Sequence, residues 1–174
     1  MNKETFIKEV NNLGYELTDK QIDQFETYAN FLLEYNSHTN LTAIKEKEQV
    51  YLKHFFDSIT IIKSYDFNTV NNLIDIGTGA GFPGMVIKIL YPNIEVTLLD
   101  SNNKKINFLK ELSKRLNLEN ITFCHERAEE YARKNIETYD IVTSRAVAPL
   151  NILLEYAIPL LKINKYFIAY KGNI

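Results

Sequence analysis

The sequence predicts an α/β fold in which a largely parallel, Rossmann-like sheet follows a small lobe of helices. From about residue 70 onward, short β-branched runs alternate with helical segments of about 10–15 residues, a pattern typical of βαβ units. A glycine-rich segment joins the first of these runs to the helix that follows it. The residues before it show helical periodicity alone. Together these observations place a ligand site at the carboxyl ends of the strands.

Residues 1–66 are predicted to form the helical lobe. Phe6, Val10 and Leu13 recur at helical spacing, and Gly14 marks the end of that helix. Thr18 is predicted to cap the second helix, because Gln21 three residues later completes a capping box. A third helix is expected from an apolar series that ends shortly before the lobe boundary. This series comprises Val50, Tyr51, His54, Phe55, Ser58, Ile59 and Ile62.

Residues 67–174 are predicted to form the sheet domain. Strands are expected over residues 73–76, 94–100, 120–124, 139–143 and 166–170, with helices near 83–90, 102–116, 126–134 and 149–161. The last strand ends four residues before Ile174, and a sheet that ends on a new strand leaves an exposed edge. We therefore expect that the chain is truncated and lacks C-terminal strands, or that another segment covers the edge.

Composition excludes several classes of protein. The net charge of −2 and pI of about 6.0 argue against a general nucleic-acid coat, so any contact with nucleic acid must use local patches. The single cysteine, Cys124, excludes an internal disulfide and a cysteine-based metal cluster, and with three histidines no metal site is expected. No apolar run is long enough to span a membrane, and the polar start is unlike a signal peptide. We expect a cytoplasmic monomer without a membrane partner.

The glycine-rich segment runs Asp75-Ile-Gly77-Thr-Gly79-Ala-Gly81-Phe-Pro-Gly84. It holds four of the chain's six glycines, so a ligand could lie against bare backbone. Residues 79–84 match the dinucleotide pattern G-x-G-x-x-G, whereas residues 75–81 match the D-x-G-x-G-x-G loop of class I S-adenosylmethionine-dependent methyltransferases. Asp75 favours the second ligand, because a carboxylate repels a pyrophosphate and attracts an ammonium or sulfonium. The fold class is therefore interpreted as a Rossmann-like class I methyltransferase fold that uses S-adenosylmethionine.

Two further positions at strand ends are candidate cofactor contacts. Asp100 ends the second strand, 23 positions after Gly77, where an acid can accept hydrogen bonds from both hydroxyls of an adenosine ribose. It could instead cap the helix that follows. Ala128 and Glu129 follow the third strand, where the adenine ring lies in this topology, although the pattern is equally typical of a helix surface. NAD and S-adenosylmethionine share the ribose, so Asp100 does not choose between them.

The segment Ser144-Arg145-Ala146 follows the fourth strand, where a methyltransferase places residues that face its acceptor. It is not the N/D-P-P-Y/F motif used for exocyclic amines, and no Pro-Cys nucleophile for carbon methylation is present. These absences favour an acceptor that is already nucleophilic, such as ring nitrogen 7 of guanine. Arg145 is the candidate catalytic residue, because its guanidinium could hydrogen-bond the carbonyl oxygen of the base or a phosphate.

Two weaker patterns each leave alternatives open. His54 and Asp57 lie three residues apart on the third predicted helix, so they could be a base and the residue that orients it, or a polar contact between helix and sheet. A basic run on the helix after the second strand could contact phosphates or be a solvated face. This run comprises Lys104, Lys105, Lys110, Lys114 and Arg115.

With these motifs in place, the chain resembles the bacterial family of 16S rRNA guanine-N(7) methyltransferase G, also called glucose-inhibited division protein B. The glycine loop alone is generic to methyltransferases, but the Pro-Gly that ends it and the Asn-Leu-Thr and His-x-x-Asp-Ser segments are more particular. The resemblance rests on Asn40–Ile44, His54–Ser58, Asp75–Gly84, Leu99–Ser101 with Lys104 and Lys105, Ala128–Glu129, Ser144–Ala146 and Lys171–Gly172.

The resemblance implies methyl transfer from S-adenosylmethionine to ring nitrogen 7 of a guanine in 16S rRNA, free or within the small ribosomal subunit. It implies cofactor contacts at Gly77, Phe82, Ala128, Glu129 and Arg145, to which the physical argument adds Gly79, Gly81 and Asp100. Members of the family continue past Lys171-Gly172 and finish the sheet with an antiparallel pair. Two alternatives stay open: a nicotinamide-dependent Rossmann oxidoreductase, and a non-catalytic RNA-binding or ribosome-assembly protein.

Overall fold

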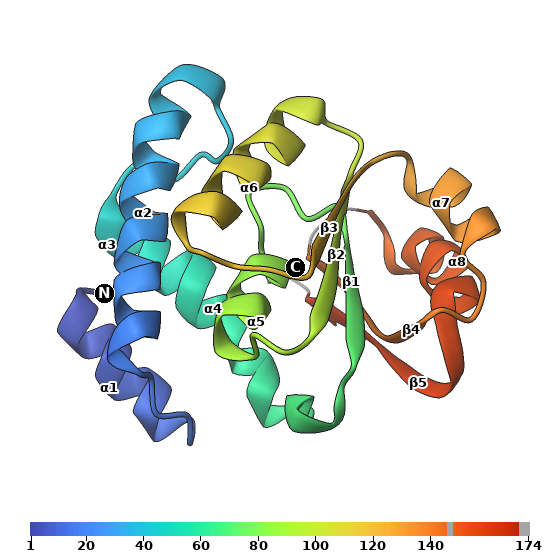
Figure 1. Ribbon diagram of the computed structural model, residues 1–174, viewed down its shortest axis with the longest axis horizontal. Coiled ribbons are helices and arrows are strands. Elements are labelled where there is room, and N and C mark those ends of the chain that lie inside the picture. The colour runs from blue at the N-terminus through green and yellow to red at the C-terminus, as the bar shows by residue number, and fades with distance from the viewer. Residues whose placement is uncertain (146–147, 171–174) are drawn as a thin grey trace.

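The computed structural model describes residues 1–145 and 148–170, and these residues adopt the predicted α/β architecture. Within them, five parallel strands form one sheet in the order β3-β2-β1-β4-β5 (Figure 1). The strands are β1 (Asn72–Ile76), β2 (Glu95–Asp100), β3 (Ile121–His125), β4 (Tyr139–Arg145) and β5 (Leu161–Tyr170). The strand order reverses between β1 and β4, and open α/β sheets bind ligands beside such a reversal, at the carboxyl ends of the strands.

Helices cover both faces of this sheet (Figure 1). One face packs against α5 (Gly84–Leu90) and α6 (Asn103–Arg115), and the other against α7 (Ala128–Lys134) and α8 (Leu150–Leu160). The helical lobe lies beyond α5 and α6, on the side of the molecule away from α7 and α8. It comprises α1 (Lys3–Asn12), α2 (Asp19–Thr39), α3 (Lys47–Gln49), π-helix η1 (Val50–Phe56), α4 (Asp57–Ile59) and 3₁₀ turn η2 (Thr60–Lys63). A further 3₁₀ turn, η3 (Phe67–Thr69), leads into β1.

The caps predicted for the lobe helices are confirmed. The Thr18 hydroxyl accepts a hydrogen bond from the Gln21 amide, and the Gln21 side chain accepts one from the Thr18 amide, which completes the capping box of α2. The same Gln21 side chain donates to the Ile89 carbonyl at the end of α5, and Gln24 donates to the Leu116 carbonyl after α6. Both buried side-chain amides therefore satisfy carbonyls at the ends of the sheet domain's helices, and Gln21 also caps the lobe helix.

The lobe and the adjacent face of the sheet share one hydrophobic core. A continuous cluster of buried apolar side chains extends from Phe6 in α1 to Ile141 in β4. A smaller cluster lies under α7 and α8 and includes Tyr131 and Leu160. The lobe is thus packed directly onto the sheet domain. The boundary between residues 66 and 67 stays a prediction.

Two predicted elements differ from the structure. The third helix is not a regular α-helix, because residues 50–56 adopt π-helical pairing between α3 and α4. The fifth strand begins at Leu161, five residues before the predicted Tyr166. Leu161 pairs with Tyr139 and Tyr166 pairs with Ile141, so residues 162–165, which are mostly polar, form an irregularity within the strand. Their polarity favoured a loop, which is why sequence reasoning began the strand too late.

Candidate active site

A cavity of about 510 Å³ lies where the carboxyl ends of the strands meet the lobe. Its size falls within the range of about 300–1,000 Å³ that is usual for small-molecule sites. Seven of the eight predicted cofactor-binding residues line it: Gly77, Gly79, Phe82, Asp100, Ala128, Glu129 and Arg145. The structure therefore brings together residues that lie up to 68 positions apart in β1, β2, β3 and β4 and the segments that follow them.

Gly81, the eighth predicted residue, does not line the cavity. A Cβ atom at this position would lie 2.4 Å from the Tyr28 hydroxyl and 2.8 Å from Cβ of Met85, and its φ is +103°. Glycine is required here because the loop passes close to helices α2 and α5. By contrast, a Cβ atom at Gly79 would meet nothing within 4 Å, as expected for backbone that faces the cavity.

Five backbone amides of the glycine loop donate to acceptors within the protein. The Gly79 amide donates to Oδ2 of Asp100 at 2.9 Å, and the Gly84 amide donates to Oδ2 of Asp75 at 2.9 Å. The amide of Thr78 donates to the Leu99 carbonyl. The amides of Gly81 and Phe82 both donate to the Thr78 carbonyl. A pyrophosphate site needs such amides free, so this loop is not arranged as a dinucleotide cradle.

Asp75 is fully buried and does not line the cavity, in contrast to its predicted place beside the ligand. Burial raises the pKa of its carboxyl to about 6, while the Gly84 amide and the Thr143 hydroxyl donate hydrogen bonds that oppose this rise. Asp75 therefore joins the start of α5 to β4 beneath the cavity. Any effect of its charge on a ligand is indirect.

Asp100 is not the cap of α6, because Asn102 takes that role, and its ribose contact stays a prediction. It lies in the cavity wall at the end of β2, and its Oδ1 accepts from the Asn102 amide at 2.8 Å, just before α6. Its Oδ2 accepts from Gly79, so the carboxylate also holds the glycine loop in place. A carboxylate has about four lone-pair positions, which leaves capacity for further donors such as ribose hydroxyls.

The start of α7 forms another part of the wall. Ala128 and Glu129 both line the cavity at the amino end of this helix, and the Glu129 carboxylate forms an ion pair with Nε of Arg127 at 2.9 Å. The structure thus brings Ala128 beside the cavity as predicted. The same wall includes Lys105 at the start of α6, which the sequence suggested only as a possible phosphate contact. It also includes Tyr156 from α8, which the sequence did not indicate.

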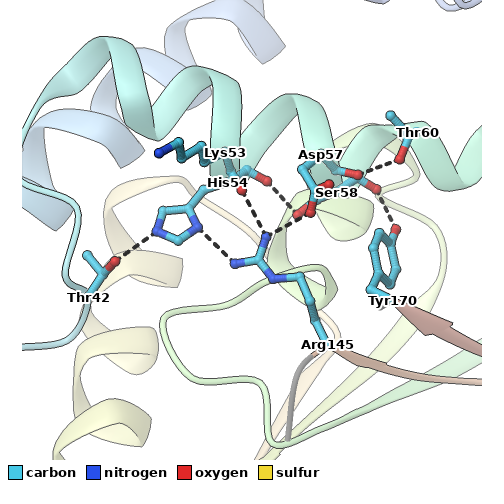
Figure 2. A network of polar contacts seen from close by, with 8 residues as sticks. All are labelled: Thr42, Lys53, His54, Asp57, Ser58, Thr60, Arg145 and Tyr170. Carbon is cyan, nitrogen blue, oxygen red and sulfur yellow. Dashed lines mark hydrogen bonds and ion pairs between the residues drawn. The ribbon is translucent and has the colours of Figure 1, made fainter. Parts of the chain in front are cut away.

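Arg145, at the end of β4, is held by three acceptors from one segment of the lobe (Figure 2). Its Nη1 donates to the Lys53 carbonyl at 3.2 Å and to Oδ2 of Asp57 at 3.2 Å, and its Nη2 donates to Nδ1 of His54 at 2.8 Å. The guanidinium also lies over the ring of Phe82, 5.1 Å from its centre. One side chain therefore connects the sheet, the glycine loop and the lobe.

His54 forms the polar contact between helix and sheet that was one of its two predicted roles. Its Nε2 lies 2.9 Å from the Thr42 hydroxyl, and its ring stacks on Phe82 with centroids 4.2 Å apart. Burial and the Arg145 charge lower the pKa of His54 to about 3, so the ring is neutral. Because both nitrogens are engaged, His54 has no free lone pair with which to act as the base of the other interpretation.

Leu41 and Thr42 form one side of the cavity. The spacing of residues in the sequence did not identify them as part of a site. These residues follow Asn40, which ends α2 in the left-handed conformation with φ of 52°. The Asn36 side chain bonds both the amide and the carbonyl of Thr42, which fixes the turn over the cavity. Nothing in the local pattern indicates that this turn faces a sheet more than 30 residues later. Ala146, Lys171 and Gly172, which the resemblance included, lie outside the described residues.

No cluster of three or more His, Cys, Asp or Glu residues is arranged to hold a metal ion within residues 1–145 and 148–170. No helix in the same ranges has the length and apolarity needed to cross a membrane.

The comparison with protein families gives one match over most of the chain. The family model described as rRNA small subunit methyltransferase G matches residues 21–174. "Ribosomal RNA small subunit methyltransferase G" of Bacillus subtilis (strain 168) is 52% identical over 174 residues, which cover 99% of this chain and 73% of the relative. The protein of the same name from Macrococcus caseolyticus is 51% identical over 173 residues, with the same coverage.

Solved structures with a similar fold are more distant in sequence. A putative caffeoyl-CoA O-methyltransferase from Staphylococcus aureus gives a TM-score of 0.58 at 23% identity, over 81% of this chain and 65% of that one. An S-adenosylmethionine-dependent methyltransferase from Aquifex aeolicus gives 0.56 at 19% identity, over 75% and 70%. At these identities the comparison establishes the fold alone, which confirms the predicted Rossmann-like class.

Proposed function

This chain belongs to the rRNA small subunit methyltransferase G family, and we propose from that membership that it methylates a guanine of 16S rRNA. The methyl donor in this proposal is S-adenosylmethionine, and the acceptor is ring nitrogen 7. The sequence supports this acceptor, because the segment around Arg145 lacks the motif used for exocyclic amines.

The main support for S-adenosylmethionine as the cofactor is that the amides of the glycine loop already donate hydrogen bonds within the protein. A nicotinamide dinucleotide needs free amide donors for its pyrophosphate, whereas the amides of Thr78, Gly79, Gly81, Phe82 and Gly84 donate within the protein. S-adenosylmethionine has no phosphate. The same arrangement therefore disfavours the oxidoreductase alternative and suits a nucleoside that lies against the bare backbone of the loop.

The residues of the cavity fit the parts of S-adenosylmethionine. Asp100 has capacity for ribose hydroxyls, and Ala128 leaves room for the adenine ring. Gly77 and Gly79 let the ligand approach the backbone, and Arg145 offers a cation for the methionine carboxylate. Gly81 is left out of this set because it packs against Tyr28. When bound, S-adenosylmethionine supplies a methyl group activated by a sulfonium.

The chain's own contribution to catalysis in this proposal is positioning. Ring nitrogen 7 of guanine carries a free lone pair, so no residue has to remove a proton, in keeping with a neutral and fully engaged His54. Holding two reactants in line can lower a barrier by up to about 7–11 kcal/mol. Phe82 and the lobe turn at Leu41 and Thr42 border the cavity on the side where an acceptor base would enter.

The RNA partner is proposed to meet the surface around this opening. Lys105 lies at the rim of the cavity, and its exposed neighbours on α6 include Lys104, Lys110 and Lys114. These lysines can contact phosphates even though the exposed Glu111 lies among them and the chain as a whole is slightly acidic. We further propose a monomer that acts in the cytoplasm, on free 16S rRNA or on the small ribosomal subunit.

Calorimetry and methyl transfer test the proposal together. S-adenosylhomocysteine and NADH are titrated into the protein, and incorporation of labelled methyl groups is followed on naked 16S rRNA and on small subunits. We expect S-adenosylhomocysteine to bind, NADH not to bind, and label to appear as 7-methylguanosine in one of the two substrates. Arg145→Ala should reduce both cofactor affinity and methyl transfer.

Each alternative predicts a different result. Binding of NADH without S-adenosylhomocysteine would contradict the methyltransferase proposal and favour an oxidoreductase. Binding of RNA with no incorporation of label, by a chain that also binds S-adenosylhomocysteine, would favour a non-catalytic assembly protein.

A further inference from the structure

We propose that His54 is a positioning residue for the cofactor, which acts together with the Lys53 carbonyl by fixing the guanidinium of Arg145 at the edge of the cavity. The proposal rests on the proposed function in one respect, namely that Arg145 contacts the cofactor. It adds that the helical lobe supplies the acceptors that set where this cation points (Figure 2).

The π-helical pairing of residues 50–56 makes the Lys53 carbonyl available. In a regular α-helix this carbonyl would accept from the amide of Asp57, four residues later. Here the Asp57 amide donates to the carbonyls of Leu52 and His54 instead. The Lys53 carbonyl accepts from Nη1 of Arg145. Single π-helical turns are rare and occur often at functional sites, and this one has a definite consequence for Arg145.

The orientation of the His54 ring is fixed on three sides. Arginine can only donate, so Nδ1 must accept from Arg145, and the ring proton must lie on Nε2. The Thr42 hydroxyl, 2.9 Å from Nε2, is the acceptor for that proton. Stacking on Phe82 with an interplanar angle of 6° sets the plane of the ring. Arg145 therefore sets the tautomer of His54, and the Thr42 hydroxyl, which also accepts from the Ile44 amide, can accept the proton on Nε2.

The same segment of the lobe is also tied to the neighbouring strand. The Tyr170 hydroxyl at the end of β5 donates to the Ser58 carbonyl at 2.6 Å, and the Ser58 hydroxyl donates to the His54 carbonyl at 2.6 Å. Residues 53–58 are thus held at the ends of both β4 and β5. Within the described chain, the lobe takes three of the five N–H donors of Arg145, which leaves two for a ligand.

Three substitutions separate the functions of the His54 ring. His54→Asn places an amide oxygen near the position of Nδ1, so it keeps an acceptor for Arg145. His54→Gln places its amide near the position of Nε2, so it keeps the contact with Thr42 and loses the acceptor. His54→Phe keeps the stacking on Phe82 and loses both polar contacts.

We expect the affinity for S-adenosylhomocysteine to fall by about tenfold or more in His54→Gln and His54→Phe, because each variant loses a hydrogen bond to a charged group. His54→Asn should lose no more than about threefold. KM for S-adenosylmethionine should rise more than kcat falls. In an Arg145→Ala background, His54→Phe should cause no further loss, because the effect acts through Arg145.

Equal affinity of wild type, His54→Gln and His54→Phe, alongside a loss in Arg145→Ala, would overturn the inference while leaving the proposed function in place. A loss of the same size for His54→Phe in both backgrounds would also overturn it, since the role would then be structural. If the wild type does not bind S-adenosylhomocysteine, it is the proposed function that fails.

A ligand-free measurement tests the contact independently of the cofactor. Long-range ¹H–¹⁵N correlation NMR reports which ring nitrogen of each histidine carries the proton, and the His54→Asn spectrum assigns the His54 signals. We expect a neutral ring protonated on Nε2, with shifts that change in Arg145→Ala. A ring protonated on Nδ1 would contradict the inference, because such a ring cannot accept from Arg145.

Discussion

The cavity has two sides of different origin. The first, here called the nucleoside side, comprises Gly77, Gly79, Asp100, Ala128 and Glu129 and is built from segments that directly follow strands β1, β2 and β3. The second, here called the lobe side, comprises Leu41, Thr42, His54, Phe82 and Arg145 and joins the helical lobe to the glycine loop and the end of β4.

The two sides depend on different interactions. Positions on the nucleoside side are set by strand ends and by short backbone contacts such as that between Gly79 and Asp100. Positions on the lobe side are set by side chains that meet across about 90 residues, such as Arg145 and His54. A generic fold can therefore supply the nucleoside side, whereas the lobe side needs the helical lobe to hold the guanidinium of Arg145.

Two glycines of the same loop should show the largest difference in stability, because Gly81 packs against the lobe and Gly79 faces the cavity. Gly81→Ala should lower the free energy of unfolding by about 2–5 kcal/mol, because the methyl group would overlap the Tyr28 hydroxyl of the lobe at a positive φ. Gly79→Ala has open space and only the backbone strain of φ +59°, so it should cost about 1–2 kcal/mol of stability. Urea unfolding measures both variants.

Gly79→Ala should instead weaken binding of S-adenosylhomocysteine, since its methyl group would point into the nucleoside side of the cavity. The matched variant therefore keeps the fold and loses affinity. Equal stability of the two variants would show that the lobe does not pack against the loop as described.

Asp75 lies beneath the cavity, and its titration should make the free energy of unfolding depend on pH. A folded-state pKa of about 6 against an ordinary value of 3.8 means that the folded protein holds the proton more tightly than the unfolded chain does. The stability from this group is complete below pH 3.8 and is lost as pH rises through 6, by up to about 3 kcal/mol. Asp75→Asn removes this dependence.

Unfolding of wild type and Asp75→Asn by urea, from pH 4 to pH 7.5, measures the effect. The difference between the variant and the wild type should move in favour of the variant as pH rises, with most of the change between pH 4 and pH 6.5. The lowered pKa of His54 contributes equally to both proteins and cancels. A difference that does not change with pH would mean that Asp75 is not buried as described.

The nucleoside side could be predicted from sequence because its signals are local. Asp100 and Ala128 were identified by their positions after strands, and the capping box of α2 by residues three positions apart. Two other inferences, both from the glycine loop, were incomplete. Asp75 and Gly81 belong to the same motif as Gly79, yet both pack beneath the cavity, because a motif gives spacing without showing which way each residue faces.

The lobe side could not be predicted in the same way. His54 and Asp57 were singled out by helical spacing, but their side chains share Arg145 as a partner, and that contact depends on the sheet some 90 residues later. The π-helical pairing at Lys53 has no signature in the local apolar pattern. Long-range polar contacts are selected by the assembled fold, so residues such as Thr42 were seen only through resemblance to a family.

Crystals soaked with S-adenosylhomocysteine provide the most direct test of the central claim, that the cavity between the glycine loop and the lobe holds a nucleoside methyl donor. The account predicts ligand density between Gly79 and Ala128, with ribose hydroxyls within hydrogen-bond distance of Asp100 and the methionine carboxylate beside Arg145. Crystals that leave this cavity empty, or that hold the ligand elsewhere on the protein, would contradict it.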